Sequence, residues 1–150
     1  MPWIIGLLAL YLLLLLVVAW ISIRPPRLPV YISPGVFDAP QEEIAIPYKG
    51  RWLRGWWVEG GPNVAVFAHG YLMNRAELTP VAVKLWKEGM SSLLIDFHGH
   101  GRSARGKVTM GLQEREDVRA AVQFARSRKN GKLVLIGSSM GSAASALAMA

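Results

Sequence analysis

The residues best suited to chemistry lie in the stretch KLVLIGSSMGSAASALAMA, residues 132–150. Gly137, Ser139 and Gly141 match Gly-x-Ser-x-Gly, a weak pattern by itself in a chain with 15 glycines. The context is stronger, because a strand-like apolar run leads in and an alanine-rich helical run leads out. Such a tight turn exposes the serine hydroxyl and directs helix-start amides at charge that develops beside it. The sequence therefore predicts Ser139 as a nucleophile for acyl transfer.

Acyl transfer also requires two hydrogen-bond donors for the oxyanion. One expected donor is the amide of Met140, the residue after the nucleophile. The other is expected in the loop after an earlier strand, VAVFAHGYLMN (64–74), where we assign it to the amide of Tyr71. His69 and Gly70 are then structural residues of this loop, and a catalytic base at His69 is the minor alternative.

Histidines and cysteines limit the remaining chemistry. His69, His98 and His100 all precede Ser139 in the chain. His98 and His100 offer two metal ligands without a third nearby, so we expect no metal and no other cofactor. The chain has no cysteine, which excludes disulfides and thiolate metal sites.

Alternating strands and helices must position these residues. The pattern predicts a strand at 64–68, a helix at 76–88 and a strand at 92–96. A second helix, which Thr109 caps and which ends at Asn130-Gly131, and a last strand at 132–136 follow. We expect that second helix to carry Leu112, Val118, Val122 and Phe124. This order is typical of an α/β fold with a parallel sheet and helices on both faces.

A predicted antiparallel hairpin precedes the alternating region. Its strands are residues 42–48 and 51–59, joined at Lys49-Gly50. Trp52, Arg54, Trp56 and Val58 would share one face of the second strand. We expect the tryptophans to pack against the core, and insertion into a membrane is the alternative.

The first part of the chain, residues 1–23, reads as a transmembrane anchor. Trp3 to Ile23 carry no charge over more than the roughly 20 residues that cross a bilayer. A cleaved signal peptide is the alternative, but the segment lacks a basic start and is longer than such peptides.

Residues 24–40 hold five prolines and read as a semi-rigid linker that lifts a domain of residues 41–150 off the membrane. Arg24 and Arg27 directly after the span place that domain in the cytoplasm by the positive-inside rule. The net charge of +7 fits a basic surface facing anionic lipid, and without a long basic run we expect no nucleic-acid partner.

Four motifs in order give residues 41–150 a family resemblance: GRWLRGW (50–56), VFAHG (66–70), DFHGHGRS (96–103) and GSSMG (137–141). The chain resembles the alpha/beta-hydrolase superfamily, in particular its membrane-anchored serine hydrolases of the acylhydrolase and aminopeptidase-like kind. The resemblance implies the alpha/beta-hydrolase fold, Ser139 as nucleophile, Tyr71 and Met140 as oxyanion amides, and a structural loop that begins at Asp96. The family usually has arginine where this chain has His98.

In that family the catalytic acid and histidine follow the nucleophile, and only a helix follows Ser139 in this sequence. We therefore expect a truncated N-terminal half of a hydrolase, inactive in this form, or else a complete degenerate protein. Two functions follow: a membrane-anchored serine hydrolase that cleaves an ester, thioester or amide, with lipid-like acyl substrates favoured, or a non-catalytic membrane-tethered binding or scaffold protein.

Overall fold

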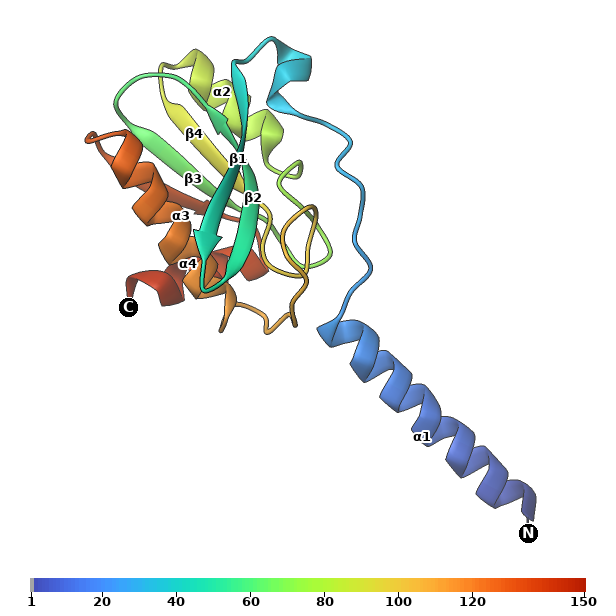
Figure 1. The fold of residues 1–150 in the computed structure, drawn as a ribbon. Helices are drawn as coiled ribbons and strands as arrows, with labels where there is room; N and C mark the ends of the chain where they lie inside the picture. The colour runs from blue at the N-terminus through green and yellow to red at the C-terminus, as the bar shows by residue number, and fades with distance from the viewer. Residues whose placement is uncertain (1) are drawn as a thin grey trace.

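A computed structural model describes residues 2–150 and shows a long helix that projects from a globular part (Figure 1). The helix α1 spans Pro2–Ile23, and none of its residues is buried. By length and composition it can cross a membrane, and among the described residues it alone can do so. Because α1 has no buried residue, it is not a core helix of the globular part.

The globular part is built on a five-stranded mixed sheet in the order β1-β2-β4-β3-β5. The strands are β1 Gln41–Tyr48, β2 Arg51–Val58, β3 Val64–Ala68, β4 Ser91–Ile95 and β5 Leu133–Gly137. The predicted hairpin is present as the antiparallel pair β1 and β2, and β2 also pairs antiparallel with β4. The three strands of the alternating region are parallel, as expected.

Helices cover both faces of the sheet, and each face has its own apolar core (Figure 1). On one face lie α3 (Glu114–Arg128) and α4 (Met140–Met149), which pack against each other and against the sheet. On the other lies α2 (Thr79–Lys87), next to the short 3-10 helix η1 (Pro34–Phe37). Trp57 is buried in the first core and Trp56 in the second, as expected, but Trp52 is 51% exposed and does not pack against the core.

The register of the parallel strands brings the predicted site residues to one edge of the sheet. Ala68 of β3 pairs with Ile95 of β4 on one side and with Gly137 of β5 on the other. The residues that follow these strand ends therefore emerge together at the carboxyl edge, where ligands bind in open α/β sheets.

The predicted start of the second helix is wrong. The structure has turns over residues 110–113, and α3 begins only at Glu114. Met110 and Gly111 have φ of 54° and 110°, which a right-handed helix cannot contain. Leu112 is accordingly 58% exposed rather than part of the buried helix face.

The linker also departs from the prediction, because it lies against the globular part. Asn74 donates its side-chain amide to the carbonyls of Leu28 and Pro29 at 3.1 Å each. The end of α1 is held as well: the Val108 amide donates to the Ile23 carbonyl at 2.9 Å, and the Tyr71 hydroxyl to that of Ser22 at 2.9 Å. The prolines stiffen a segment that is docked rather than a free spacer.

Candidate active site

Ser139 lies on the turn between β5 and α4, and its backbone is strained. Its φ of 47° and ψ of −113° belong to a region that non-glycine residues rarely adopt. Such strain persists only where the surrounding structure enforces it, and it concentrates at functional sites. The residue is exposed, and no hydrogen bond involves its hydroxyl among the contacts within residues 2–150. The hydroxyl is thus free to meet a ligand.

The glycine at position 141 explains how the turn is enforced. A Cβ atom there would lie 2.0 Å from the Ala68 carbonyl oxygen and 2.7 Å from that of His69. Both contacts are backbone atoms, which cannot swing away. The turn and the end of β3 therefore pack directly against each other, and the Ser138 amide donates to the Ala68 carbonyl at 2.9 Å.

Ser138, the neighbouring serine, is occupied elsewhere. Its hydroxyl donates to the Glu77 carboxylate at 2.8 Å, and the other oxygen of that carboxylate accepts the Gly70 amide at 2.7 Å. Glu77 therefore ties the loop after β3 to the turn that carries Ser139. The sequence pattern does not reveal Glu77, because no motif marks a residue seven positions after Gly70.

The two amides predicted for the oxyanion flank this contact. Met140 is the first residue of α4, and Tyr71 follows Gly70 in the loop after β3. Neither amide donates a hydrogen bond among the contacts within residues 2–150, so both are free to donate to a ligand oxygen. The helix start adds a favourable partial positive charge for an anion.

His69 is buried, and both of its ring nitrogens are bound to the backbone. Nδ1 lies 2.7 Å from the Gly70 carbonyl, and Nε2 accepts the Phe97 amide at 3.0 Å. This arrangement requires the neutral ring with its proton on Nδ1. Burial lowers the pKa of His69 to about 3, and the neighbouring His100 adds to this effect. The geometry suits a structural residue that links two loops, and a base would have to break one of these bonds.

Asp96 anchors the loop after β4. Its carboxylate accepts the Arg75 amide at one oxygen and the Arg102 amide at the other, each at 2.8 Å. Burial raises the pKa of this carboxyl group, while the two amides and the Arg75 guanidinium oppose the shift. The Asp96 side chain thus serves the backbone of two loops beside the site.

A histidine and carboxylate contact that the sequence did not predict joins His98, in the loop after β4, to Asp117 on α3. His98 Nδ1 is 2.5 Å from the Asp117 carboxylate, whose other oxygen accepts the His98 amide at 2.9 Å. The pair borders a cavity of about 240 Å³ to which Ser139 does not contribute. A carboxylate from α3 therefore holds both the backbone and the ring of His98.

The structure brings most of the predicted site residues to one edge of the sheet. Ser139 and Met140 adjoin the loop of His69, Gly70 and Tyr71, and Asp96 begins the next loop. Within residues 2–150, no group of three or more His, Asp or Glu side chains is arranged so that it could hold a metal ion.

The mixed sheet, its two helical layers and the strained strand-to-helix turn define an alpha/beta hydrolase, the predicted class. The chain belongs to the serine aminopeptidase S33 family, whose sequence model matches residues 62–150. A search of curated proteins finds no match.

Solved structures agree on the fold. The esterase Pf2001 of Pyrococcus furiosus is 32% identical with a TM-score of 0.74, over 80% of this chain and 51% of that chain. Est1E of Butyrivibrio proteoclasticus, solved with ferulic acid, is 21% identical with a TM-score of 0.65, over 70% and 46%. The epoxide hydrolase VrEH1 of Vigna radiata is 18% identical with a TM-score of 0.61, over 72% and 35%. The chain thus spans about half the length of the esterase and less of the epoxide hydrolase.

Proposed function

We propose that this protein is a membrane-anchored serine hydrolase that cleaves an ester, thioester or amide through Ser139. The observation that carries the proposal is the strained backbone of Ser139, exposed between a buried sheet and a helix start. Membership of a serine hydrolase family supports it. The similar esterase from Pyrococcus furiosus favours an ester among the three substrate classes.

On this proposal the Ser139 oxygen attacks the carbonyl carbon of the substrate. The oxygen of that carbonyl becomes an oxyanion held by the amides of Tyr71 and Met140. Its collapse releases the alcohol, thiol or amine, which takes up the proton that the Ser139 hydroxyl gives up, and leaves an acyl group on Ser139. Water then attacks the acyl carbon, the carboxylic acid is released, and the Ser139 oxygen regains a proton. None of the three histidines contacts the Ser139 hydroxyl, so the proposal assigns the general base to none of them.

The anchor part of the proposal rests on α1. It is uncharged, unburied and long enough to cross a bilayer. Trp3 and Trp20 lie about 25 Å apart along the helix at 1.5 Å per residue, a spacing that suits the two interfacial layers. An anchored enzyme works beside lipid, and lipid-like acyl substrates are the class we propose.

Covalent labelling tests the nucleophile. The protein produced from its native gene is treated with a fluorophosphonate probe, and the labelled peptide is identified by mass spectrometry. We expect the probe on Ser139, no labelling of Ser139→Ala, and most of the labelling retained in Ser138→Ala, whose hydroxyl is bound to Glu77. Labelling at Ser138 would contradict the assignment, and a folded protein inert to the probe would favour the non-catalytic binding protein.

A further inference from the structure

A basic cavity lies where the end of α1 meets the globular part. Its volume is about 570 Å³, and its walls are the start of the linker and the loop after β4. Four cationic side chains line it, two from each wall: Arg24, Arg27, Arg105 and Lys107. The remaining lining residues are two prolines of the linker and two glycines of the loop, which carry no charge.

No carboxylate neutralises these four side chains. The ion pairs within residues 2–150 involve none of them. The pKa of the Arg27 guanidinium is lowered, first by burial and then by the charge of Arg105, while Asp96 opposes the shift. Like charges thus face one another across the cavity, and a bound anion would relieve their repulsion.

The two walls are fixed to each other by hydrogen bonds. The Val108 amide, next to Lys107, donates to the carbonyl of Ile23, the last residue of α1, at 2.9 Å. Arg27 reaches across to the Gly101 carbonyl at 3.4 Å. On the linker side, the Arg24 guanidinium lies over the Trp20 ring at 3.8 Å from its centroid. The cavity is thus a formed site between two connected segments.

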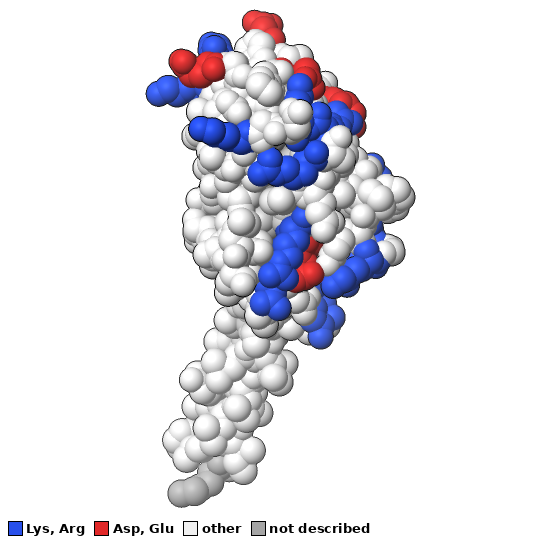
Figure 2. Space-filling view, turned by 90° about the vertical axis from the view of Figure 1, so that its left-hand side faces the viewer, with Lys and Arg blue, Asp and Glu red and all other residues white. Residues whose placement is uncertain are grey.

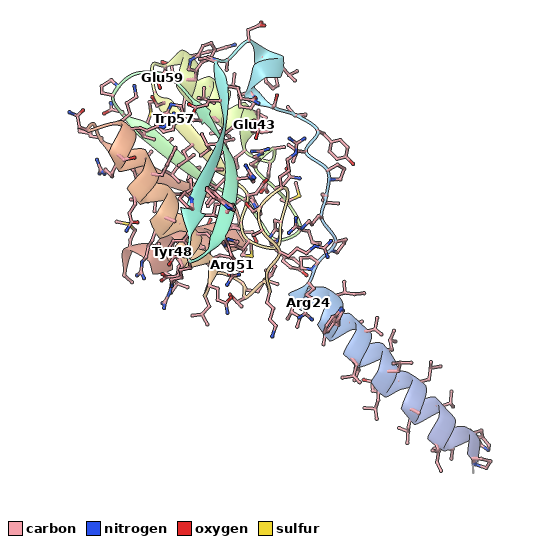
Figure 3. The ribbon with its side chains drawn as sticks, in the orientation of Figure 1. Arg24, Glu43, Tyr48, Arg51, Trp57 and Glu59 are labelled. Atoms are coloured by element: carbon pink, nitrogen blue, oxygen red, sulfur yellow. The ribbon has the colours of Figure 1, made fainter. Side chains whose placement is uncertain are left out.

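Its place along the molecule indicates the kind of anion. Figure 3 shows Arg24 at the end of α1 that adjoins the globular part. On the face seen in Figure 2 the projecting helix shows no charged side chain, and the part of the globular unit nearer to it carries several basic side chains with an acidic one among them. If α1 crosses a bilayer, these four cations lie at the level of the phospholipid headgroups.

We propose that this cavity binds the phosphate group of an anionic phospholipid. The proposal rests on the membrane anchoring proposed above and adds a defined lipid site to it. Arginine suits this role because its planar guanidinium donates two parallel hydrogen bonds to phosphate oxygens. A phosphodiester with a net negative charge leaves the cavity less positive, whereas a zwitterionic headgroup brings its own cation into a site that already holds four.

Calorimetric titration of the chain in nonionic detergent micelles tests the site. The probes are dihexanoylphosphatidylglycerol, dihexanoylphosphatidylcholine and inorganic phosphate, each corrected for partition into empty micelles. We expect saturable binding of the phosphatidylglycerol alone. Arg105→Gln with Lys107→Gln should weaken it about tenfold or more. The control pair Lys84→Gln with Lys87→Gln removes equal charge from exposed sites on α2 and should change it less than about twofold.

A second variant, Arg24→Gln with Arg27→Gln, removes the cations of the other wall and should weaken the binding of phosphatidylglycerol to a similar extent. If one of the two variants fails to fold, the other still tests the proposal. Equal loss in the control pair, equal affinity for phosphatidylcholine, or retained affinity in both wall variants would each overturn it. Binding of inorganic phosphate as tight as that of phosphatidylglycerol would assign the site to free phosphate instead. These measurements depend neither on α1 crossing a bilayer nor on a reaction at Ser139, so their failure is distinct from failure of the proposed function.

Discussion

Single side chains hold the site together through the backbone of neighbouring loops. Glu77 joins the Gly70 amide to the Ser138 hydroxyl, and Asp96 joins two amides from different loops. Each carboxylate satisfies donors that would otherwise remain unpaired in partly buried surroundings. Removal of one such partner costs more than the net value of its hydrogen bond, because the remaining donor keeps its desolvation penalty.

Glu77→Ala is therefore expected to lower the free energy of unfolding by about 1–3 kcal/mol. It should also reduce labelling of Ser139, since the loop of Tyr71 loses its tie to the turn. Urea unfolding followed by tryptophan fluorescence measures the first effect. Glu88→Ala, an exposed residue just after α2, is the matched control and should change the free energy by less than about 0.5 kcal/mol. An unchanged midpoint in Glu77→Ala would refute the bridging role.

The buried ring of His69 makes stability depend on pH. Its pKa is about 3 in the folded protein, against about 6.5 in an unfolded chain. Between these values the unfolded state binds a proton that the native state excludes, so stability is lost as pH falls. Burial lowers the pKa of His100 too, with the same sign.

We expect the free energy of unfolding to fall by up to about 1.4 kcal/mol per pH unit for His69 as pH decreases from 6.5 to 4.5. Carboxylates of the unfolded chain, with pKa values of about 4, take up protons only at the lower end of this window. His69→Asn should flatten the slope even though it lowers stability overall. Urea midpoints at several pH values measure the slope, and an unchanged slope in His69→Asn would show that the pH dependence does not arise from this ring.

At the scale of elements, the strand-to-helix turn is defined by close backbone contact. Gly141→Ala places a methyl group 2.0 Å from the Ala68 carbonyl oxygen, which belongs to a central strand. We expect destabilisation of about 3 kcal/mol or more, because β3 and α4 must separate. Gly35→Ala, whose nearest neighbour would lie at 3.5 Å, should be nearly neutral. Equal thermal midpoints for the two variants would mean that the close contact is not what defines the turn.

The central elements could be predicted from the sequence because local pattern and tertiary environment agree. Residues 64–68 and 91–95 are apolar or small and fully buried in β3 and β4. The start of α3 could not be predicted, because Glu114 stabilises the preceding turns. Its carboxylate accepts the amides of Thr109 at 2.9 Å and Gly111 at 2.8 Å. Thr109 is a residue type that commonly caps helices, and its hydroxyl oxygen does accept a hydrogen bond from the Gln113 amide at 2.7 Å. This bond, however, lies in the turns before the helix begins.

The candidate site divides in the same way. Ser139, Met140 and the His69 loop could be predicted, since each follows a strand with a local motif. Glu77 and the His98 and Asp117 pair could not, because their partners are distant in sequence and only the folded chain brings them together. Charged residues on amphipathic helices are ordinarily solvated, so nothing local distinguishes Asp117 from the other acids of α3.

At the scale of the whole molecule, the proposal of an anchor makes a direct prediction. The protein should stay in membranes after a carbonate wash and keep its amino terminus, as measured by blotting and by sequencing the mature protein. Leu12→Arg with Leu13→Arg should release it, since each arginine costs about 2.5–3.5 kcal/mol at the centre of a spanning helix. A soluble form that starts near Ser22 would show cleavage instead. The positive-inside rule further predicts that a reporter fused after Pro40 is cytoplasmic.

The hydrogen bonds from Val108 to Ile23 and from Tyr71 to Ser22 tie the end of α1 to the loops after β4 and β3. The carboxyl ends of β3, β4 and β5 then lie on the side from which the helix departs (Figure 1). If the protein is the anchored hydrolase proposed above, a substrate dissolved in the bilayer would reach Ser139 by lateral diffusion. The turnover rate would then follow the mole fraction of substrate among the lipids, and dilution with inert lipid at constant bulk concentration would slow it.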